Sequence, residues 1–143
     1  MKKIVIFFGI IIIIICGISY IFLNYKANYN MLKKANLEFE NYLNEEIYGT
    51  DLSTVINRAV DSNEKNEVEK NNKGIYLDNG KNSISIEVKM IDNDSIYQME
   101  TFYKNGMQNF LNYYSNIKFK CTNIKYHEST KKVKYMLFEQ ITS

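Results

Sequence analysis

The sequence predicts an α+β fold. We expect an N-terminal transmembrane helix continuing into a long amphipathic helix, then a short helix and a small antiparallel sheet of about four strands with one further helix. Three observations predict this class. An uncharged apolar run comes first, apolar residues then recur every three or four positions as far as Val60, and apolar and polar residues alternate in two segments after Gly74. Helical and strand patterns thus occupy separate parts of the chain, which is typical of helices packed on one face of an antiparallel sheet.

The N-terminal run extends from Ile4 to Leu23 without a charged residue or a proline. A helix of about 20 residues spans ~30 Å at ~1.5 Å per residue, which matches the hydrocarbon core of a bilayer. We therefore expect residues 1–23 to form a cytoplasmic tip and a transmembrane signal-anchor, with the lipid bilayer as the partner of the apolar run.

Processing of this segment is the competing interpretation. A cleaved secretory signal has an apolar core of only ~7–15 residues and a small-residue cleavage site, for which Gly17 is a weak candidate. A lipoprotein signal would end at Cys16, but the residue before it, Ile15, is large and β-branched. The length and the flanks of the run favour an uncleaved anchor.

The orientation of the anchor depends on the lysines at its two ends. Lys2 and Lys3 favour a cytoplasmic N-terminus, whereas Lys26, Lys33 and Lys34 place a similar positive charge on the other side. The very short basic tail resembles that of a secretory signal. We therefore expect a single-pass protein of the cell membrane, with the rest of the chain outside the cytoplasm.

The rest of the chain, residues 24–143, has the length of one domain and is electrically balanced. The whole chain has 18 basic and 16 acidic residues, and removing Lys2 and Lys3 leaves 16 of each. This balance argues against a nucleic-acid partner. Cys121 is the only cysteine in this part, so no disulfide can form within it. Isoleucine and asparagine, at 20 and 19 residues, have A/T-rich codons, which indicates a low-GC genome, and we expect a low-GC Gram-positive bacterium as the source.

The anchor helix is expected to continue beyond the membrane. Apolar residues from Tyr25 through Phe39 to Ile47 fall at steps of three or four, and the next helix-breaking residue is Gly49. We expect the helix to reach about Ile47 and its apolar stripe to pack against the protein's own domain. Packing against a partner helix is the alternative.

A second, shorter helix is expected over residues 51–62. Its apolar positions follow the spacing of one buried helical face, and Thr50 or Asp51 can serve as the N-cap. The next residues, 63–73, are polar and are expected to form a solvated loop.

Residues 74–92 are predicted to form a β-hairpin. Asn79 and Gly80 suit a type I′ turn, and a two-residue turn at this place would put Ile75 opposite Ile84. A third helix is expected over residues 97–114, although its first residues also alternate like a strand. Gly106 inside this helix costs ~1 kcal/mol relative to alanine, so a close approach to another element is expected there.

The C-terminal part is predicted to form a second hairpin. Apolar residues alternate from Ile117 to Cys121, and a change of phase near Thr122 and Asn123 indicates a β-bulge. Residues 128–131 are expected to turn the chain into a return strand over residues 133–138.

Few residues suggest chemistry. His127 and Cys121 could in principle act as base and nucleophile, but we expect an exposed histidine at a turn and a buried, inert cysteine. Asp92, Asn93 and Asp94 resemble half of a calcium loop without its glycine and distal glutamate, and we expect a simple turn. We therefore expect no enzyme activity, no cofactor and no metal site.

A local excess of lysine marks a possible partner surface near the C-terminus. Its positive charge could contact an anionic lipid, a teichoic-type polymer or an acidic protein, and a solvated outer face of the sheet is the alternative. The lysines are Lys118, Lys120, Lys125, Lys131, Lys132 and Lys134.

A long, half-apolar N-terminal helix followed by a small sheet resembles the architecture of type IV pilins and pseudopilins. Their leader ends in glycine, for which Gly9 is the only candidate here, and the fifth position after it holds Ile14 where that family has glutamate. The resemblance is therefore one of architecture.

This resemblance implies a non-enzymatic structural or assembly subunit of a surface or secretion apparatus, which works with protein partners or copies of itself. The alternative is an anchored binding module or lipoprotein that recognises a wall polymer, a lipid or a protein.

Overall fold

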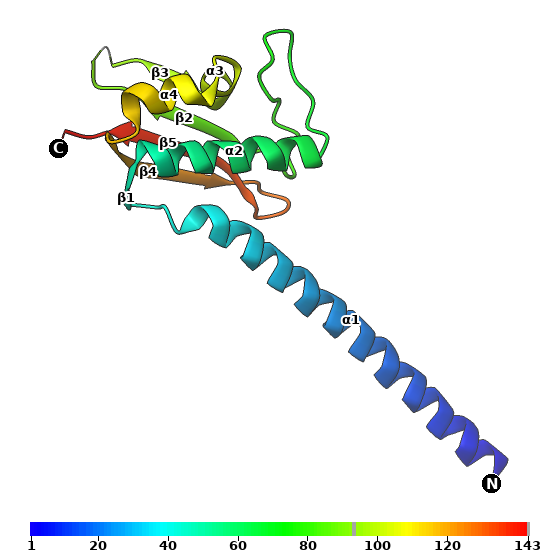
Figure 1. Ribbon diagram of the computed structural model, residues 1–143. Helices are drawn as coiled ribbons and strands as arrows, with labels where there is room; N and C mark the ends of the chain where they lie inside the picture. The colour runs from blue at the N-terminus through cyan, green and yellow to red at the C-terminus, as the bar shows by residue number, and fades with distance from the viewer. Residues whose placement is uncertain (93, 143) are drawn as a thin grey trace. The chain divides into compact units, whose positions relative to one another are not determined.

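The computed structural model describes residues 1–92 and 94–142 and has an α+β fold, as predicted (Figure 1). The elements in chain order are α1 (Lys2–Glu40), β1 (Glu46–Tyr48), α2 (Gly49–Lys65), β2 (Ser85–Lys89), β3 (Ile96–Gln98), α3 (Met99–Lys104), α4 (Met107–Tyr114), β4 (Lys118–Tyr126) and β5 (Val133–Gln140). The chain divides into two compact units, Met1–Ala35 and Asn36–Ser143.

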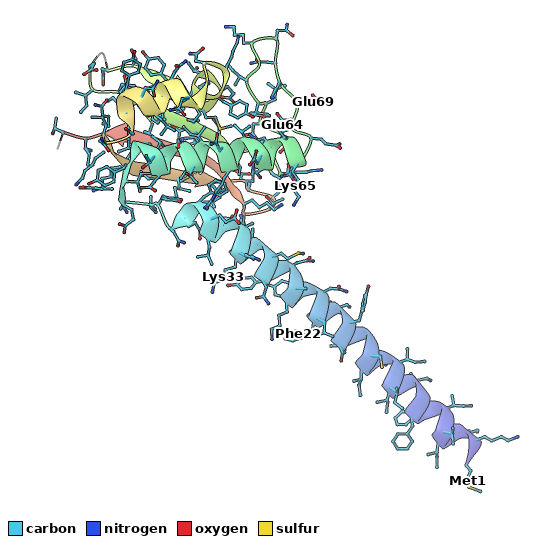
Figure 2. The ribbon with its side chains drawn as sticks, in the orientation of Figure 1. Met1, Phe22, Lys33, Glu64, Lys65 and Glu69 are labelled. Atoms are coloured by element: carbon cyan, nitrogen blue, oxygen red, sulfur yellow. The ribbon has the colours of Figure 1, made fainter. Side chains whose placement is uncertain are left out.

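The first unit contains most of helix α1, including its apolar run. This helix is long and apolar enough to cross a membrane, and no residue of its most apolar stretch is buried. Figure 2 shows the side chains along it, with Phe22 labelled near the end of the apolar run.

Helix α1 ends at Glu40, so the predicted continuation to Ile47 is wrong. Asn44 adopts a φ of 64°, and its backbone N–H donates to the carbonyl of Cys121 at 2.9 Å. Ile47 then lies opposite Phe119 in strand β1. The last apolar residues of the predicted helix, Leu43 and Ile47, therefore belong to a turn and to strand β1. Pairing with β4 supplies the backbone hydrogen bonds that a further helical turn would have made. Phe39 is buried in the core of the second unit.

The sheet has five strands in the order β1-β4-β5-β2-β3 and is mixed, whereas the sequence suggested about four antiparallel strands. Strands β2 and β5 are parallel, with Ile86 opposite Met136, and the other neighbouring strands are antiparallel. The two short edge strands, β1 and β3, were not predicted as strands of their own. Each has only three residues, so each gives a weak sequence pattern.

The predicted hairpin over residues 74–92 does not form. Gly80 does turn the chain, with a φ of 70°, but the preceding segment pairs with residues just before it in the chain. The Leu77 N–H donates to the Glu69 carbonyl at 2.8 Å, and the Asn71 N–H donates to the Ile75 carbonyl at 2.9 Å. The backbone groups that would have paired with β2 are thus already occupied.

The second predicted hairpin is confirmed by β4 and β5. Their antiparallel register shifts between Cys121 and Asn123, which places a β-bulge at the predicted position. The buried residues of β4, Phe119 and Cys121, alternate with half-buried lysines. One face of this hairpin therefore lies in the core.

Helices α2, α3 and α4 cover that face of the sheet (Figure 1). Helix α2 begins at Gly49, earlier than predicted, and its N-cap is Tyr48, so neither Thr50 nor Asp51 caps it. A side chain at Gly49 would overlap with the backbone carbonyl of Tyr114 at the end of α4, so only glycine fits this contact.

The predicted third helix is divided into strand β3 and helices α3 and α4. Gly106 lies between the two helices with a φ of 86°, which explains the glycine by backbone conformation and not by close packing. A row of aromatic contacts then joins this region to the sheet, from Phe102 through Phe110 to Phe119, with ring centroids 5.0 and 6.1 Å apart.

Candidate functional site

The lysines of the predicted partner surface are distributed along the whole β4–β5 hairpin. Lys118 lies at its open end and forms an ion pair with Glu46 at 3.2 Å. Lys120 lies opposite Glu46 on one side and Glu139 on the other. Acidic residues of neighbouring strands therefore offset part of this positive charge.

The other lysines lie toward the turn of the hairpin. The Lys125 ammonium is 5.0 Å from the ring centroid of Tyr135, and Lys134 forms an ion pair with Asp78 at 3.0 Å. Lys131 and Lys132 belong to the turn itself, where Lys131 has a φ of 58°. The six lysines thus form an extended strip, and several of them already contact acidic or aromatic residues of the same chain. Their role as a surface for a binding partner stays a prediction.

His127 is buried, so the prediction of an exposed histidine is wrong. Its Nε2 lies 2.8 Å from the carbonyl of Ser83, and its Nδ1 lies 3.6 Å from Asp78. The neighbouring hydroxyls of Ser129 and Thr130 donate to the carbonyls of residues 80 and 81. The turn between β4 and β5 therefore holds the loop that precedes β2, and this contact buries the imidazole.

Cys121 is buried in the core, as predicted, and its Sγ lies 3.8 Å from the carbonyl of Asn123. Burial raises the pKa of this thiol to about 11, so it is protonated and unreactive at neutral pH. The partners of Cys121 and His127 are different, and the structure does not join the two residues into a pair.

The predicted turn at residues 92–95 includes Asn93, which lies outside the described residues. Asp94 forms an ion pair with Lys89 at 2.7 Å. Within the described part of the chain, no group of three or more histidine, cysteine, aspartate or glutamate residues could hold a metal ion.

The second unit has a cavity of about 780 Å³ between the segment 69–77 and helix α3. Its floor includes Val60 of α2, which is almost fully buried. In Figure 1 the loop that follows α2 stands beside α3, and Figure 2 labels Glu64 at the end of α2 and Glu69 in that loop. A volume of this size lies within the usual range for small-molecule sites, ~300–1,000 Å³.

One wall of the cavity is held in place by its own hydrogen bonds. The Asn71 side chain accepts from the backbone N–H groups of Lys73 and Ile75 at 2.9 and 3.1 Å. Gly74, with a φ of 82°, completes the turn at the tip. Because these bonds are local, the wall has a defined shape although few of its side chains are buried.

A charged cluster fixes the base of this wall to helix α2. Lys70 forms an ion pair with Glu64 at 2.7 Å, and the Tyr76 hydroxyl donates to the same carboxylate. The lysine and the phenol together hold the pKa of Glu64 below its usual value, whereas burial and the neighbouring carboxylate raise the pKa of Tyr76 to about 12. The Lys70 ammonium also lies 4.5 Å from the Tyr76 ring centroid.

Glu100 joins the two walls. One carboxylate oxygen accepts the backbone N–H of Tyr76 at 3.1 Å. The other oxygen is buried and has no hydrogen-bond partner among the described residues. A buried carboxylate oxygen without a donor costs ~1–3 kcal/mol or more, so a donor at this point of the wall would stabilise the protein.

The rim of the cavity is basic and partly aromatic. Lys73 at the tip of the loop and Lys104 at the end of α3 are exposed and have no ion-pair partner in the described part of the chain. Tyr103 of α3 is about half exposed at the same rim. The arrangement can bind a ligand through two cations and an aromatic ring.

Sequence reasoning did not find this cavity. The loop residues suggested only a solvated segment, and Glu100 lies 24 positions after Tyr76 in a predicted helix. The sequence signal that could have indicated it is the presence of both lysine and tyrosine in the segment 69–77 and again in residues 103–104.

Comparison of the chain with protein-family models, with curated proteins and with solved structures gives no match. The resemblance to type IV pilins and pseudopilins therefore stays a prediction from the order of the elements.

Proposed function

We propose that this chain is a single-pass membrane protein that presents a binding domain, residues 36–142, on the outside of the cell. The observation that carries the proposal is the division of the chain into an apolar helix whose side chains are not buried and a unit with its own hydrophobic core. An apolar helix of this length is stable in a bilayer and not in water.

The orientation in this proposal comes from the two lysines that precede the apolar run. Lys2 and Lys3 hold the N-terminus in the cytoplasm, as in a secretory signal, so the domain lies on the opposite side. The cavity described above gives the domain a preformed site for a ligand, and this supports a binding function.

An assembly subunit is the second candidate, and the length of α1 favours it. At ~1.5 Å per residue, a helix of 39 residues spans almost twice the ~30 Å hydrocarbon core. The part of α1 beyond Leu23 carries Tyr25 and Tyr29 at helical spacing and could pack against the same helix of another copy.

Chemical cross-linking in native membranes separates the two candidates. If the chain presents a binding domain, the full chain is expected to remain a monomer of 16.9 kDa after treatment with an amine-reactive cross-linker. A ladder of integer multiples of that mass would support the assembly subunit and contradict the proposal. Intact-mass measurement of the purified chain shows in addition whether the N-terminus is retained or has been cut near Gly9, Cys16 or Gly17.

A further inference from the structure

We propose that the cavity between the segment 69–77 and helix α3 binds a sugar that carries a phosphate or carboxylate group. The inference rests on the proposed function, because a domain outside the cell meets the anionic sugars of envelope polymers. Two kinds of side chain at the rim of the cavity suit two parts of such a ligand.

The anionic group of the ligand is matched by the rim. Lys73 and Lys104 come from opposite walls, and each is exposed and without an ion-pair partner in the described part of the chain. Lys70, the third lysine of the cavity, is already paired with Glu64. The two unpaired ammonium groups therefore supply the positive charge available to a ligand, and phosphate and carboxylate oxygens are their natural partners.

The body of the ligand is matched by an aromatic ring. Tyr103 is about half exposed on α3 and lines the cavity, so its ring face can cover the apolar face of a sugar ring. The volume of about 780 Å³ accepts a monosaccharide unit together with a linked neighbour, which suits a repeating polymer.

Glu100 contributes to the wall of the cavity. One of its carboxylate oxygens accepts the Tyr76 N–H, and the other is buried, so the buried oxygen is not reached by a ligand in the cavity. The negative charge of this wall disfavours a small bare anion, whereas the rim lysines attract the anionic group of a larger ligand. The cavity therefore selects a ligand that is anionic at one end and presents the apolar face of a sugar ring at the other.

Isothermal titration calorimetry on the full chain in detergent micelles tests the inference with four probes: glucose 6-phosphate, glucuronate, glucose and inorganic phosphate. We expect the first two to bind with a Kd near or below about 1 mM, and the neutral sugar and the bare ion to bind at least about tenfold more weakly. Equal affinity for inorganic phosphate and glucose 6-phosphate would overturn the inference, as would the absence of binding by all four probes.

Charge reversal locates the site. The double variant Lys73→Glu/Lys104→Glu is expected to weaken glucose 6-phosphate binding by about tenfold or more, since each change removes a charge-assisted contact. The matched control Lys65→Glu/Lys81→Glu alters two exposed lysines outside the cavity and is expected to retain the affinity. An equal loss of affinity in both double variants would show that binding depends on the overall charge of the protein, and it would contradict the location of the site in this cavity.

Two further measurements complete the test. Tyr103→Ala should weaken binding of glucose 6-phosphate without changing the near-ultraviolet circular dichroism of the core aromatics. Displacement of bound glucose 6-phosphate by a purified teichoic-type polymer would identify the envelope as the source of the ligand, and no displacement would identify a free sugar phosphate. The titrations use purified protein, so their failure would overturn this inference and leave the proposed orientation to its own test.

Discussion

Replacement of Asn63 by alanine tests how helix α2 is attached to the sheet. Asn63 is fully buried near the end of α2, and its amide makes two hydrogen bonds to the backbone of a single residue. Its Nδ2 donates to the carbonyl of Ile84 at 2.7 Å, and its Oδ1 accepts the Ile84 N–H at 2.8 Å. These bonds fix the chain just before it enters strand β2.

The magnitude follows from the two peptide groups that the substitution leaves behind. Each lost hydrogen bond contributes ~1 kcal/mol net, and each buried group without a partner costs ~1–3 kcal/mol. The gain in helix propensity on changing asparagine to alanine offsets ~0.6 kcal/mol. We therefore expect Asn63→Ala to lower the free energy of unfolding by about 2–4 kcal/mol.

The assay is urea unfolding of the full chain in detergent micelles, followed by near-ultraviolet circular dichroism of the tyrosines. Asn57→Ala is the matched control, because Asn57 lies on the same helix and is exposed. We expect the control to raise the stability by no more than ~0.6 kcal/mol, through the gain in helix propensity. The absence of a loss larger than ~0.6 kcal/mol in Asn63→Ala, with an unchanged m value, would refute the reasoning.

Three other predictions concern the same domain. Gly49→Ala should lower the free energy of unfolding by about 1–3 kcal/mol in the same assay, because a Cβ at this position overlaps with the Tyr114 carbonyl. Gly9→Ala is the control and should not lower the free energy of unfolding, because a Cβ at Gly9 meets no other atom. The pKa of Asp78 is lowered by a backbone N–H and a lysine, so its contribution is present above about pH 4 and is lost as the pH falls through the folded-state pKa. As the pH is lowered below about 4, the free energy of unfolding should therefore decrease less in Asp78→Asn than in the wild type. The difference should be less than ~1 kcal/mol, because the Asp78 side chain is half exposed. Identical dependence of the unfolding free energy on pH in the two proteins would contradict this. Cys121 should react with a soluble thiol reagent only after unfolding, and reaction in the native protein would contradict its burial.

Elements with a strong local period were predictable from the sequence. The buried residues of α2, such as Leu52 and Ile56, repeat at helical spacing, and the structure confirms the helix with two to three additional residues at each end. The β4–β5 hairpin and its bulge followed in the same way from alternation and a change of phase.

Strand pairing could not be predicted, because it depends on competition between distant partners. The segment before Gly80 pairs with residues 69–71, where Asn71 also holds the backbone through its side chain. Strand β2 was thereby left to pair in parallel with β5, more than 40 positions later in the chain. No local pattern distinguishes these two arrangements.

The candidate site was hidden for the same reason. His127 is buried through a contact with Ser83, 44 positions earlier, and Glu100 meets Tyr76 across 24 positions. The lysines that the sequence emphasised are close in the chain, whereas the unpaired lysines of the cavity, Lys73 and Lys104, come from different elements. Composition indicates which charges are present, and only the fold determines which of them have partners.

The location of the domain outside the cell is the central claim, and thiol labelling in intact cells tests it most directly. Cys121 is buried, so the probe is Glu69→Cys, at an exposed position of the loop after α2, in a Cys16→Ala background (Figure 2). A membrane-impermeant maleimide should label the introduced thiol in intact cells as fully as in lysed cells. Labelling only after lysis would place the domain in the cytoplasm and contradict the account.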